Sequence, residues 1–328
     1  MISIVLPTYN SISFIKERVA TIINQTIEEW ECVVIDGEST DGTWDYLIDI
    51  ALKDSRFKMF QFPPKGVYNA WNIGIKKSKG DFIYFATSDD TMTSNCLEEL
   101  LYGFQLCPRS GIAHCCLTII DEKSEKVTFM DWRGFPAQQY FKELTNKYHI
   151  RKAPLVGVLY ATHNTIIHSF TQVLIRKDVF DQIGFFIEDK GPQADLEWGM
   201  RAGLTVDIVH VPLELATWRV HKNQLTSIET NQEINKTIID LMYLALISNK
   251  KMNLNSFQIK RILFFKNWNS IKTLPFQKKI FSLEYYKLRF RTIINYDLMK
   301  SINNRNRYHE FLMNEVLEND FIKLTEEL

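Results

Sequence analysis

The sequence predicts an α/β fold built on a doubly wound, mostly parallel sheet, followed by a helical C-terminal region. Short apolar runs of strand length alternate with segments of helical periodicity over the first part of the chain. Polar residues, several of them acidic, follow those apolar runs directly. From about residue 226 onward the apolar spacing is helical only. We therefore expect an α/β domain over 1–225 and a helical region over 226–328.

Four apolar runs near the N-terminus have the length of buried strands: residues 2–6, 31–37, 58–62 and 82–90. Pro7 has no N–H to donate to a strand ladder, so we expect it to end the first strand. The segments between the runs, about 13–24, 43–52 and 67–78, repeat apolar residues at helical spacing. Strands that alternate with helices in this way form parallel sheets, and ligands bind beyond the carboxyl ends of such strands.

The alternation continues less regularly after residue 95. It consists of a helix over 95–106, a strand over 112–120, a strand, turn and helix over 171–186, a helix over 194–203 and a strand over 205–211. Gly184 and Gly203 are expected to end the two later helices, and Pro212 is expected to end the last strand. The stretch 125–170 predicts loops with one short helix.

Overall composition excludes several classes of protein. The 39 Lys and Arg balance 39 Asp and Glu, which argues against a dedicated nucleic-acid-binding protein. No apolar stretch approaches the ~18–20 residues that span a bilayer, and the start MISIVLPTYN lacks the features of a secretory signal. The five cysteines contain no CxxC pair, which is typical of reduced thiols in the cytoplasm. We expect no disulfide between Cys115 and Cys116.

The charge is unevenly distributed along the chain. Residues 251–300 carry eleven Lys and Arg against Glu284 and Asp297, a net charge of +9, with ten aromatic residues interleaved. Two interpretations remain open. The segment is either a helical packing module with solvated basic faces, or an interfacial contact with an anionic membrane surface.

Acidic residues follow two of the predicted strands. Asp89 and Asp90 end the fourth strand, and adjacent carboxylates repel each other unless a cation or hydrogen-bond donors compensate. A divalent ion would fit there, but so would capping of the helix that follows. Asp36 ends the second strand and is either a turn residue or an acceptor for a nucleotide. The residues alone do not decide between these alternatives.

The combination of motifs carries more information than each one. SIVLPTYN, VVIDGESTDGT and GVYNAWNIGIKKSKGDFIYFATSDD follow one another, and TQVLIRKDVFDQIGFF, ADLEWGMRAG and HVP come later. In order and spacing they resemble the inverting glycosyltransferase family 2, which has the Rossmann-like GT-A fold. The resemblance covers about 1–225 and implies that this region is the catalytic domain.

The resemblance also implies roles for individual residues. Pro7, Thr8 and Tyr9 would line the nucleotide pocket, Asp36 would accept a hydrogen bond from uracil, and Asn72 would approach the same pocket. Ser88, Asp89 and Asp90 belong to TSDD, which is similar to the family's D-x-D motif, with Asp89 as the metal ligand. Thr87 stands where the first Asp of that motif is usual, so the number of protein ligands is open. His221 is either a ligand to the metal or diphosphate, or a structural histidine.

Asp195 resembles the catalytic base of the family's Glu-Asp pair, although Ala194 replaces the Glu. The base would take the proton of the attacking acceptor hydroxyl. The alternative for Asp195 is an acid that interacts with the helix dipole. Glu197 is the second candidate for the base, and Trp198 and Arg201 on the same helix are candidates for shaping the acceptor site.

By this resemblance the chain would transfer a hexose or N-acetylhexosamine from a UDP-sugar, with Mn²⁺ or Mg²⁺ as cofactor. The acceptor would be a hydroxyl of a glycan or lipid-linked glycan, in bacterial polysaccharide or lipooligosaccharide synthesis on the cytoplasmic face of the plasma membrane. A nucleotidyltransferase is a rival, but PTYNSIS lacks the Gly-rich basic loop that a triphosphate needs. A non-catalytic sugar-binding protein is a second rival, which Thr87 and Ala194 keep open.

Overall fold

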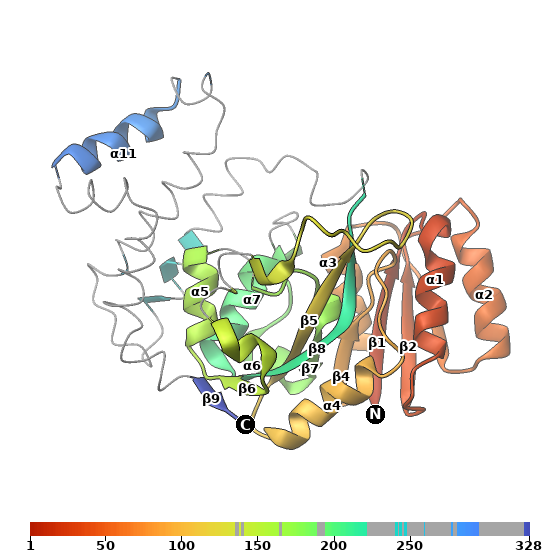
Figure 1. The fold of residues 1–328 in the computed structure, drawn as a ribbon. Coiled ribbons are helices and arrows are strands. Elements are labelled where there is room, and N and C mark those ends of the chain that lie inside the picture. The colour runs from red at the N-terminus through yellow and green to blue at the C-terminus, as the bar shows by residue number, and fades with distance from the viewer. Residues whose placement is uncertain are drawn as a thin grey trace.

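The computed structural model describes residues 1–134, 138, 141–163, 166–188, 194–221, 281–294 and 325–328, with a few single positions between 240 and 277. The strands are β1 (Ile2–Thr8), β2 (Trp30–Asp36), β3 (Phe57–Gln61), β4 (Phe82–Phe85), β5 (Ile112–Ile120), β6 (His149–Arg151), β7 (Val173–Arg176), β8 (Ile208–Arg219) and β9 (Thr325–Glu327). They form one sheet in the order β3-β2-β1-β4-β7-β5-β8-β6-β9 (Figure 1).

The N-terminal half of the sheet is parallel, as the sequence predicts. Strands β1, β2, β3 and β4 pair in parallel, and so do β5 and β8. Strand β7 lies antiparallel between β4 and β5 and joins the two parallel parts. Strands β6 and β9 extend the far edge in antiparallel pairing. The predicted α/β fold with a mostly parallel sheet is therefore confirmed.

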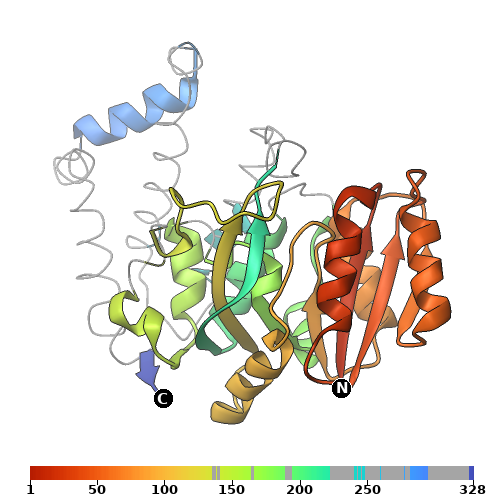
Figure 2. The ribbon, with the colours of Figure 1, turned by 45° about the vertical axis from the view of Figure 1, so that its right-hand side comes forward.

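Helices cover both faces of the sheet (Figure 2). They are α1 (Ile12–Ile23), α2 (Thr43–Lys53), α3 (Val67–Lys77), α4 (Cys96–Leu106), α5 (Leu155–His163), α6 (Asp178–Ile183), α7 (Ala194–Thr205) and α11 (Leu283–Ile294), with short 3₁₀ turns at Trp132–Gly134, Lys142–Asn146 and Phe170–Gln172. Helices α1, α2 and α4 pack on one face, and α3, α5, α6 and α7 pack on the other.

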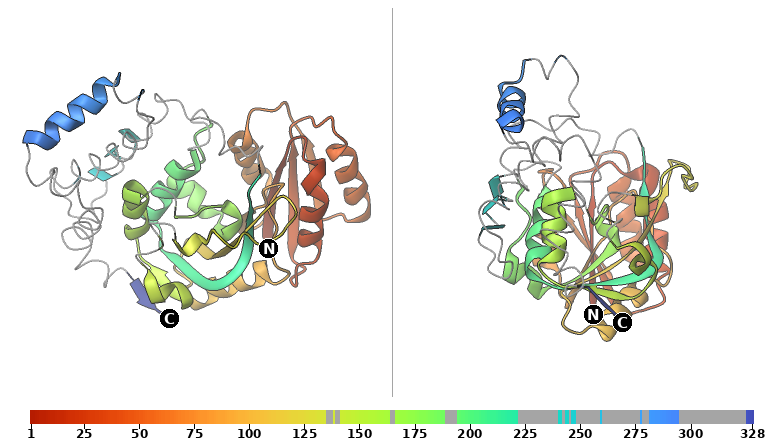
Figure 3. Two further views of the ribbon diagram at one scale, coloured as in Figure 1. Left: turned by 45° about the horizontal axis from the view of Figure 1, so that its top comes forward. Right: turned by 60° about the vertical axis from the view of Figure 1, so that its left-hand side comes forward.

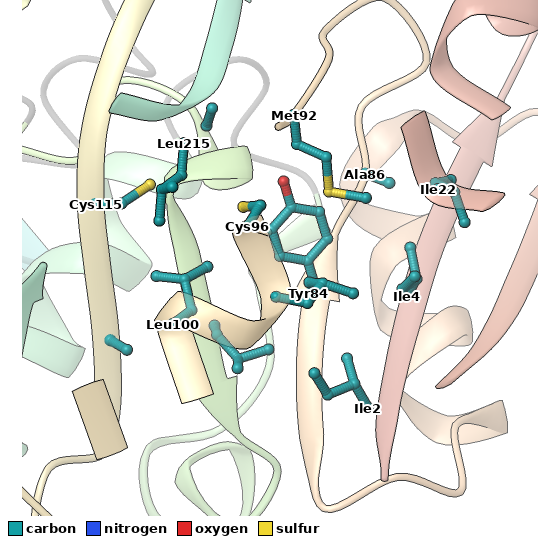
Figure 4. Packing of buried hydrophobic residues seen from close by; sticks show 14 of the residues in the cluster. Ile2, Ile4, Ile22, Tyr84, Ala86, Met92, Cys96, Leu100, Cys115 and Leu215 are labelled. Atoms are coloured by element: carbon teal, nitrogen blue, oxygen red, sulfur yellow. The ribbon is translucent and has the colours of Figure 1, made fainter. Parts of the chain in front are cut away.

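Strand residues alternate between the two resulting cores. Ile4 of β1 faces the core under α1 and α4, while the next residue, Val5, faces the core under α3. Figure 4 shows the first of these cores, where Tyr84 of β4 lies between Ile2 and Ile4 of β1 and Cys96 of α4. All five cysteines are free and buried.

Two prolines that were expected to end strands lie inside them. Strand β1 runs through Pro7 to Thr8. Ala86 N donates to Val5 O, so the backbone N–H and C=O of Val5 point toward β4. The backbone groups of Pro7, two residues later, point the same way, but β4 ends at Phe85. The N–H that Pro7 lacks would therefore have had no strand partner.

Strand β8 likewise continues through Pro212 to Arg219. Val211 pairs with Cys115, but the next residue of β5, Cys116, pairs with Glu214, which leaves Pro212 in a bulge. The prediction that Pro212 ends the strand was wrong. The added length carries the end of β8 to the edge where β1, β2 and β4 end.

The expected helix end at Gly203 is also wrong, because α7 continues to Thr205. A Cβ on Gly203 would lie 2.5 Å from the backbone N of Gly157 in α5. This glycine lets two helices approach closely and does not cap one. Gly184, by contrast, does end α6, with φ of 83°.

Two further elements were not expected from the sequence. The stretch 125–170 contains the predicted short helix, which is the nine-residue α5, but it also contains strand β6, where only loops were predicted. Strand β9 lies in the region where only helices were expected, and it pairs with β6. The boundary near residue 225 lies outside the described residues and stays a prediction.

Candidate active site

A cavity of about 410 Å³ opens at the carboxyl ends of β1, β2 and β4, where the sequence places a ligand crevice. Its walls come from the turn after β1, the Pro63–Gly66 segment, the first turn of α3, the acids after β4, the Ser169 turn and the start of α7. Among the predicted site residues it is lined by Pro7, Thr8, Tyr9, Asp36, Ser88, Asp89, Asp90 and Asp195. The fold therefore gathers most of the predicted site in one place.

Asp36 lies fully buried at the floor of the cavity. Its carboxylate accepts hydrogen bonds from Thr8 Oγ1 at 2.8 Å, Ser39 N and Oγ at 2.9 and 2.6 Å, and Gln61 Nε2 at 3.1 Å. A carboxylate has about four acceptor sites, so these donors occupy it. Hydrogen bonding of Asp36 to uracil stays a prediction, and it requires one of these donors to move. Tyr9, which is 58% exposed, lies beside Gly37 at the rim.

Asp90 points into the protein interior and is 3% exposed. Its Oδ2 accepts from Thr87 Oγ1 at 2.6 Å and Ser169 Oγ at 2.9 Å, and its Oδ1 accepts from Arg219 N at 2.7 Å. Burial, and then the charge of Asp89, raise the pKa of Asp90 to about 7. Thr87 thus donates a hydrogen bond to Asp90. Asp90 joins three segments around the cavity.

Asp89 is the acid that faces outward, with 28% of its side chain exposed. Its Oδ2 lies 3.0 Å from Nε2 of His221, whose side chain is 11% exposed. Two neighbouring ligands of an octahedral ion with bonds of about 2.1 Å lie about 3.0 Å apart. In this structure the two side chains hydrogen-bond to each other, and their spacing and mixed oxygen and nitrogen donors also suit Mn²⁺.

Within the described ranges, no group of three or more His, Cys, Asp and Glu side chains is placed to hold a metal. An ion at Asp89 and His221 would complete its coordination with phosphate oxygens and water, as Mg²⁺ sites commonly do. The residues present fit such an ion, with two protein ligands.

Arg219 positions these two ligands, and its guanidinium is directed to protein groups and does not line the cavity. It is 1% exposed. Its Nε donates to Asp89 O at 2.6 Å, Nη2 pairs with Glu17 at 2.7 Å, and Nη1 donates to Asp121 O and Ser124 Oγ. The buried cation fixes the acid-bearing turn to the end of β8.

Asp195 is the second residue of α7 and lies half-buried on the cavity wall. Leu196 N donates to its Oδ1 at 2.6 Å, and Tyr68 hydrogen-bonds to its carboxylate. Burial outweighs these bonds and raises the pKa of Asp195 to about 6. A base whose pKa lies near neutrality is well matched to proton transfer at cellular pH.

Glu197, the second candidate for the base, is 2% exposed and ion-paired with Arg201 at 2.6 Å. Arg201 also donates to the backbone oxygens of Ile183 and Phe185. Trp198 is fully buried, with its indole N–H donated to Gly184 O at 3.0 Å. These three side chains anchor α7 to the segment after α6, and none of them lines the cavity.

Asn72 makes its hydrogen bonds to other protein groups in this structure. Its amide nitrogen donates to Phe186 O and Glu188 Oε1, both at 2.9 Å, and its oxygen accepts from Phe186 N at 3.1 Å. Asn72 therefore holds the segment that leads to α7, one turn away from the cavity-lining Tyr68. A direct role for Asn72 toward the nucleotide stays a prediction.

Several residues that line the cavity were not identified from the sequence. They include Tyr68, Trp71, His168, Ser169, Phe170 and Trp218. Ser169 and Gln172 form a capping box around the Phe170–Gln172 turn, and the pattern Ser-x-x-Gln is a recognisable signal for such a turn. That signal could have located Ser169.

The Ser169 turn connects the site to a buried row of histidines. His114, His210 and His149 lie in register on β5, β8 and β6. Gln172 Oε1 accepts from Ser169 N at 3.3 Å, and its Nε2 lies 3.3 Å from His114 Nε2. Because Gln172 can only donate there, His114 accepts through Nε2 and donates from Nδ1 to His210 Nδ1 at 3.1 Å.

Arg151 sets the protonation of the other two rings. It donates to His149 Nε2 at 3.0 Å and to His210 Nδ1 at 3.2 Å, so both nitrogens carry no proton. The remaining nitrogens then donate to the backbone oxygens of Lys147 and Thr145, both at 2.9 Å. All three rings are neutral. Burial and the Arg151 charge lower the pKa of each, that of His149 to about 3.

With this geometry described, comparison with known proteins decides the family. The profile of glycosyl transferase family 2 matches residues 3–184, which is more than half of the chain. The chain belongs to glycosyl transferase family 2. The mostly parallel sheet and the cavity at the strand ends are the parts of this family 2 chain that the sequence predicted.

Three bacterial proteins are similar to this family 2 chain. An uncharacterized glycosyltransferase of Rickettsia typhi is 29% identical over 235 residues, 71% of this chain and 68% of that protein. One from Haemophilus influenzae is 36% identical over 102 residues, 31% of this chain and only 41% of that protein. The Escherichia coli UDP-Glc:α-D-GlcNAc-diphosphoundecaprenol β-1,3-glucosyltransferase WfgD is 34% identical over 99 residues, 30% of this chain and 38% of that protein.

Solved structures agree on the GT-A fold. Staphylococcus aureus TarS 1–349 in complex with UDP-GlcNAc has a TM-score of 0.65 at 18% identity, over 88% of this chain and 79% of that one. The mannosyltransferase PcManGT of Pyrobaculum calidifontis, solved with GDP-Man and Mn²⁺, has a TM-score of 0.56 at 15% identity, over 90% and 75% of the two chains.

Proposed function

We propose that the protein is an inverting glycosyltransferase that moves a hexose or N-acetylhexosamine from a UDP-sugar to a hydroxyl of a glycan or lipid-linked glycan. The observation that carries this proposal is the pairing of two functions in one cavity. Asp195 supplies a carboxylate whose pKa, about 6, is close to neutrality, and Asp89 with His221 supplies donors for a divalent ion.

The protein's own groups accept the proton of the acceptor hydroxyl and set the geometry of the displacement. The acceptor hydroxyl gives its proton to the Asp195 carboxylate as its oxygen bonds to the anomeric carbon. The bond from that carbon to the diphosphate breaks on the opposite face, which inverts the configuration. Proton transfer by a positioned carboxylate contributes ~10² to 10⁴ in rate. An ion such as Mn²⁺ or Mg²⁺ held by Asp89 and His221 would supply positive charge to the diphosphate.

The choice of UDP is supported by relatives. TarS was solved with UDP and with UDP-GlcNAc, and WfgD is a UDP-glucose enzyme by name. Pro7, Thr8 and Tyr9 line the cavity, and Thr8 donates to Asp36. Ser88, which precedes Asp89, also lines the cavity and accepts a hydrogen bond from Ser11 Oγ at 3.1 Å. We assign these residues to the nucleotide and its diphosphate.

The acceptor is inferred from the name of one relative. WfgD acts on a diphosphoundecaprenol-linked sugar by name, so we extend the proposal to lipid-linked glycans made on the cytoplasmic face of the plasma membrane. None of the helices in the described part of the chain is long and apolar enough to cross a membrane. The pathway would be synthesis of a surface polysaccharide or lipooligosaccharide.

A donor screen tests the proposal. The purified protein is incubated with a panel of UDP-, GDP- and dTDP-sugars and Mn²⁺, and nucleotide release is measured with and without glycan acceptors. We expect release of UDP from at least one donor, and its loss in Asp195→Asn once an acceptor is present. Release from GDP-sugars alone would overturn the donor assignment. No release from any donor, with retained sugar binding, would identify a non-catalytic protein.

A further inference from the structure

Helix α11 exposes an unusual amount of apolar surface. Phe281, just before the helix, is 90% exposed, and Leu283, Tyr286 and Phe290 are 69%, 51% and 64% exposed. Within the described residues, no other helix exposes three large apolar side chains. Contiguous exposed apolar side chains mark interaction sites more often than isolated ones do.

The exposed residues form a stripe with basic edges. At 3.6 residues per turn, Leu283, Tyr286 and Phe290 lie within an arc of about 60°. Lys287 lies about 40° beyond one edge of this arc and Arg289 about 60° beyond the other. Both basic side chains are exposed. Arg289 Nη1 donates to Tyr285 Oη at 2.9 Å, which holds the guanidinium on its side of the stripe.

From this arrangement we propose that α11 is an interfacial helix that docks the protein on an anionic lipid bilayer. The stripe would enter the boundary between headgroups and acyl chains, while Lys287 and Arg289 contact lipid phosphates on either side. The surrounding sequence carries the matching charge, because residues 251–300 have a net charge of +9. This proposal goes beyond the transfer reaction and does not depend on it.

Charge and shape favour a bilayer over other partners. A nucleic acid would pair with the basic residues but leave Leu283 and Phe290 in water. A second copy of α11 would bury the stripes but bring the basic edges of two identical helices together, and like charges at close range repel. A bilayer with anionic headgroups satisfies the apolar stripe and both basic edges at once.

The position of α11 suits this role. Figures 1, 2 and 3 place it toward the end of the molecule at which β1, β2 and β4 finish, which is also where the cavity opens. The N-terminus and β9 lie at the other end. A protein docked through α11 would therefore hold its cavity near the membrane surface, where a lipid-linked acceptor would be found.

Vesicle co-sedimentation of the full chain tests the docking. Vesicles of phosphatidylcholine with 40% phosphatidylglycerol, and of phosphatidylcholine alone, are compared at low and high NaCl, to about 0.5 M. We expect binding to the anionic vesicles that weakens with salt, because a Debye length of ~3–10 Å screens surface charges. Lys287→Gln with Arg289→Gln should weaken binding about 30-fold, at roughly tenfold or less per charge.

A second variant separates the stripe from the charges. Leu283→Ser, Tyr286→Ser and Phe290→Ser together should abolish binding at every salt concentration. The control carries Leu52→Ser, Lys53→Gln and Lys123→Gln, at exposed positions on α2 and a distant turn, and it removes the same two units of charge as the Lys287 and Arg289 variant. It should bind vesicles like the wild type. All variants should keep the wild-type melting temperature, since the substituted side chains are exposed.

Other results would overturn the proposal. They are absence of vesicle binding by the wild type at low salt, equal loss in the control, or a wild-type dimer that the stripe variant converts to a monomer without lipid. Turnover with a soluble acceptor reports separately on the proposed function. Loss of turnover with intact vesicle binding would count against the transferase proposal and leave the docking helix standing.

Discussion

Nε2 of His221 lies 3.0 Å from Oδ2 of Asp89, although 132 residues separate them along the chain. Asp89 follows β4 and His221 follows β8, two strands that are not neighbours in the sheet. Arg219 bridges them, because its N–H donates to Asp90 and its Nε donates to Asp89 O. The fold itself therefore sets the distance between these two candidate metal ligands.

Substitution of this pair should weaken metal binding. Asp89→Asn and His221→Ala should each lower Mn²⁺ affinity by at least tenfold, measured by electron paramagnetic resonance titration with UDP present, because each removes one of two protein ligands. The fold should survive, since both residues follow the ends of strands and neither is fully buried. Asp81→Asn, at an exposed carboxylate, is the control. Full turnover after EDTA treatment would refute a metal role.

Asp195→Asn should lower kcat by ~10² or more and leave UDP binding unchanged, because it keeps the shape of the side chain and removes its basicity. Glu197→Gln should act differently. It breaks a buried ion pair with Arg201, so it should lower the melting temperature before it affects chemistry. Single-turnover kinetics and calorimetry distinguish the two effects. Full activity in Asp195→Asn with loss in Glu197→Gln would move the base to residue 197.

Tyr68→Phe should move the acid limb of the pH–kcat profile upward. The base acts as a carboxylate, so activity falls as the pH drops through the pKa of Asp195, about 6. The Tyr68 hydrogen bond stabilises the charged form, and its removal raises that pKa. Phe keeps the ring contacts with Trp71 and Phe186. An unshifted profile with a lowered plateau would indicate a packing role only.

The histidine row should make the protein sensitive to acid. His149 titrates near pH 3 when folded and near 6.5 when unfolded, so the unfolded state binds the extra proton and stability falls as pH drops below 6.5. Asp195, whose pKa is raised, opposes this effect in part. His149→Gln should therefore reduce the pH dependence of unfolding free energy by ~1.4 kcal/mol per pH unit between 6 and 4. Urea unfolding at several pH values measures it, and parallel profiles would contradict the assignment.

Gly203→Ala should destabilise the fold, although alanine favours helices by ~1 kcal/mol. The new Cβ would lie 2.5 Å from Gly157 N and 2.8 Å from Val156 C, and backbone atoms cannot move aside without separating α5 from α7. We expect a loss of ~1–3 kcal/mol or more. Gly134→Ala, where no atom lies within 4 Å, is the control. An unchanged melting temperature for Gly203→Ala would show that the two helices can separate at little cost.

Local sequence patterns were sufficient for the N-terminal half of the fold. The strands and helices from β1 to β5 were predicted nearly to their ends, because burial on both faces imposes uninterrupted apolar runs and each helix keeps its own period. The exception is β4, which was predicted over 82–90 and ends at Phe85. The grouping of the polar residues that follow these strands could be predicted in turn, since parallel strands end at the same edge of the sheet. The helix end predicted at Gly184 was correct for a local reason as well, because the positive φ at this position favours glycine.

Only the tertiary structure decided what depends on partners far along the chain. Pro7 can lie inside β1 because β4 ends beside it. Pro212 can lie inside β8 because the register with β5 shifts there, and Gly203 lies inside α7 because α5 packs closely against it. Asp89 and Asp90 are adjacent and chemically identical in the sequence. Packing turns one carboxylate toward the cavity and His221 and surrounds the other with donors. Burial and long-range hydrogen bonds make that distinction, and neither is encoded in local spacing.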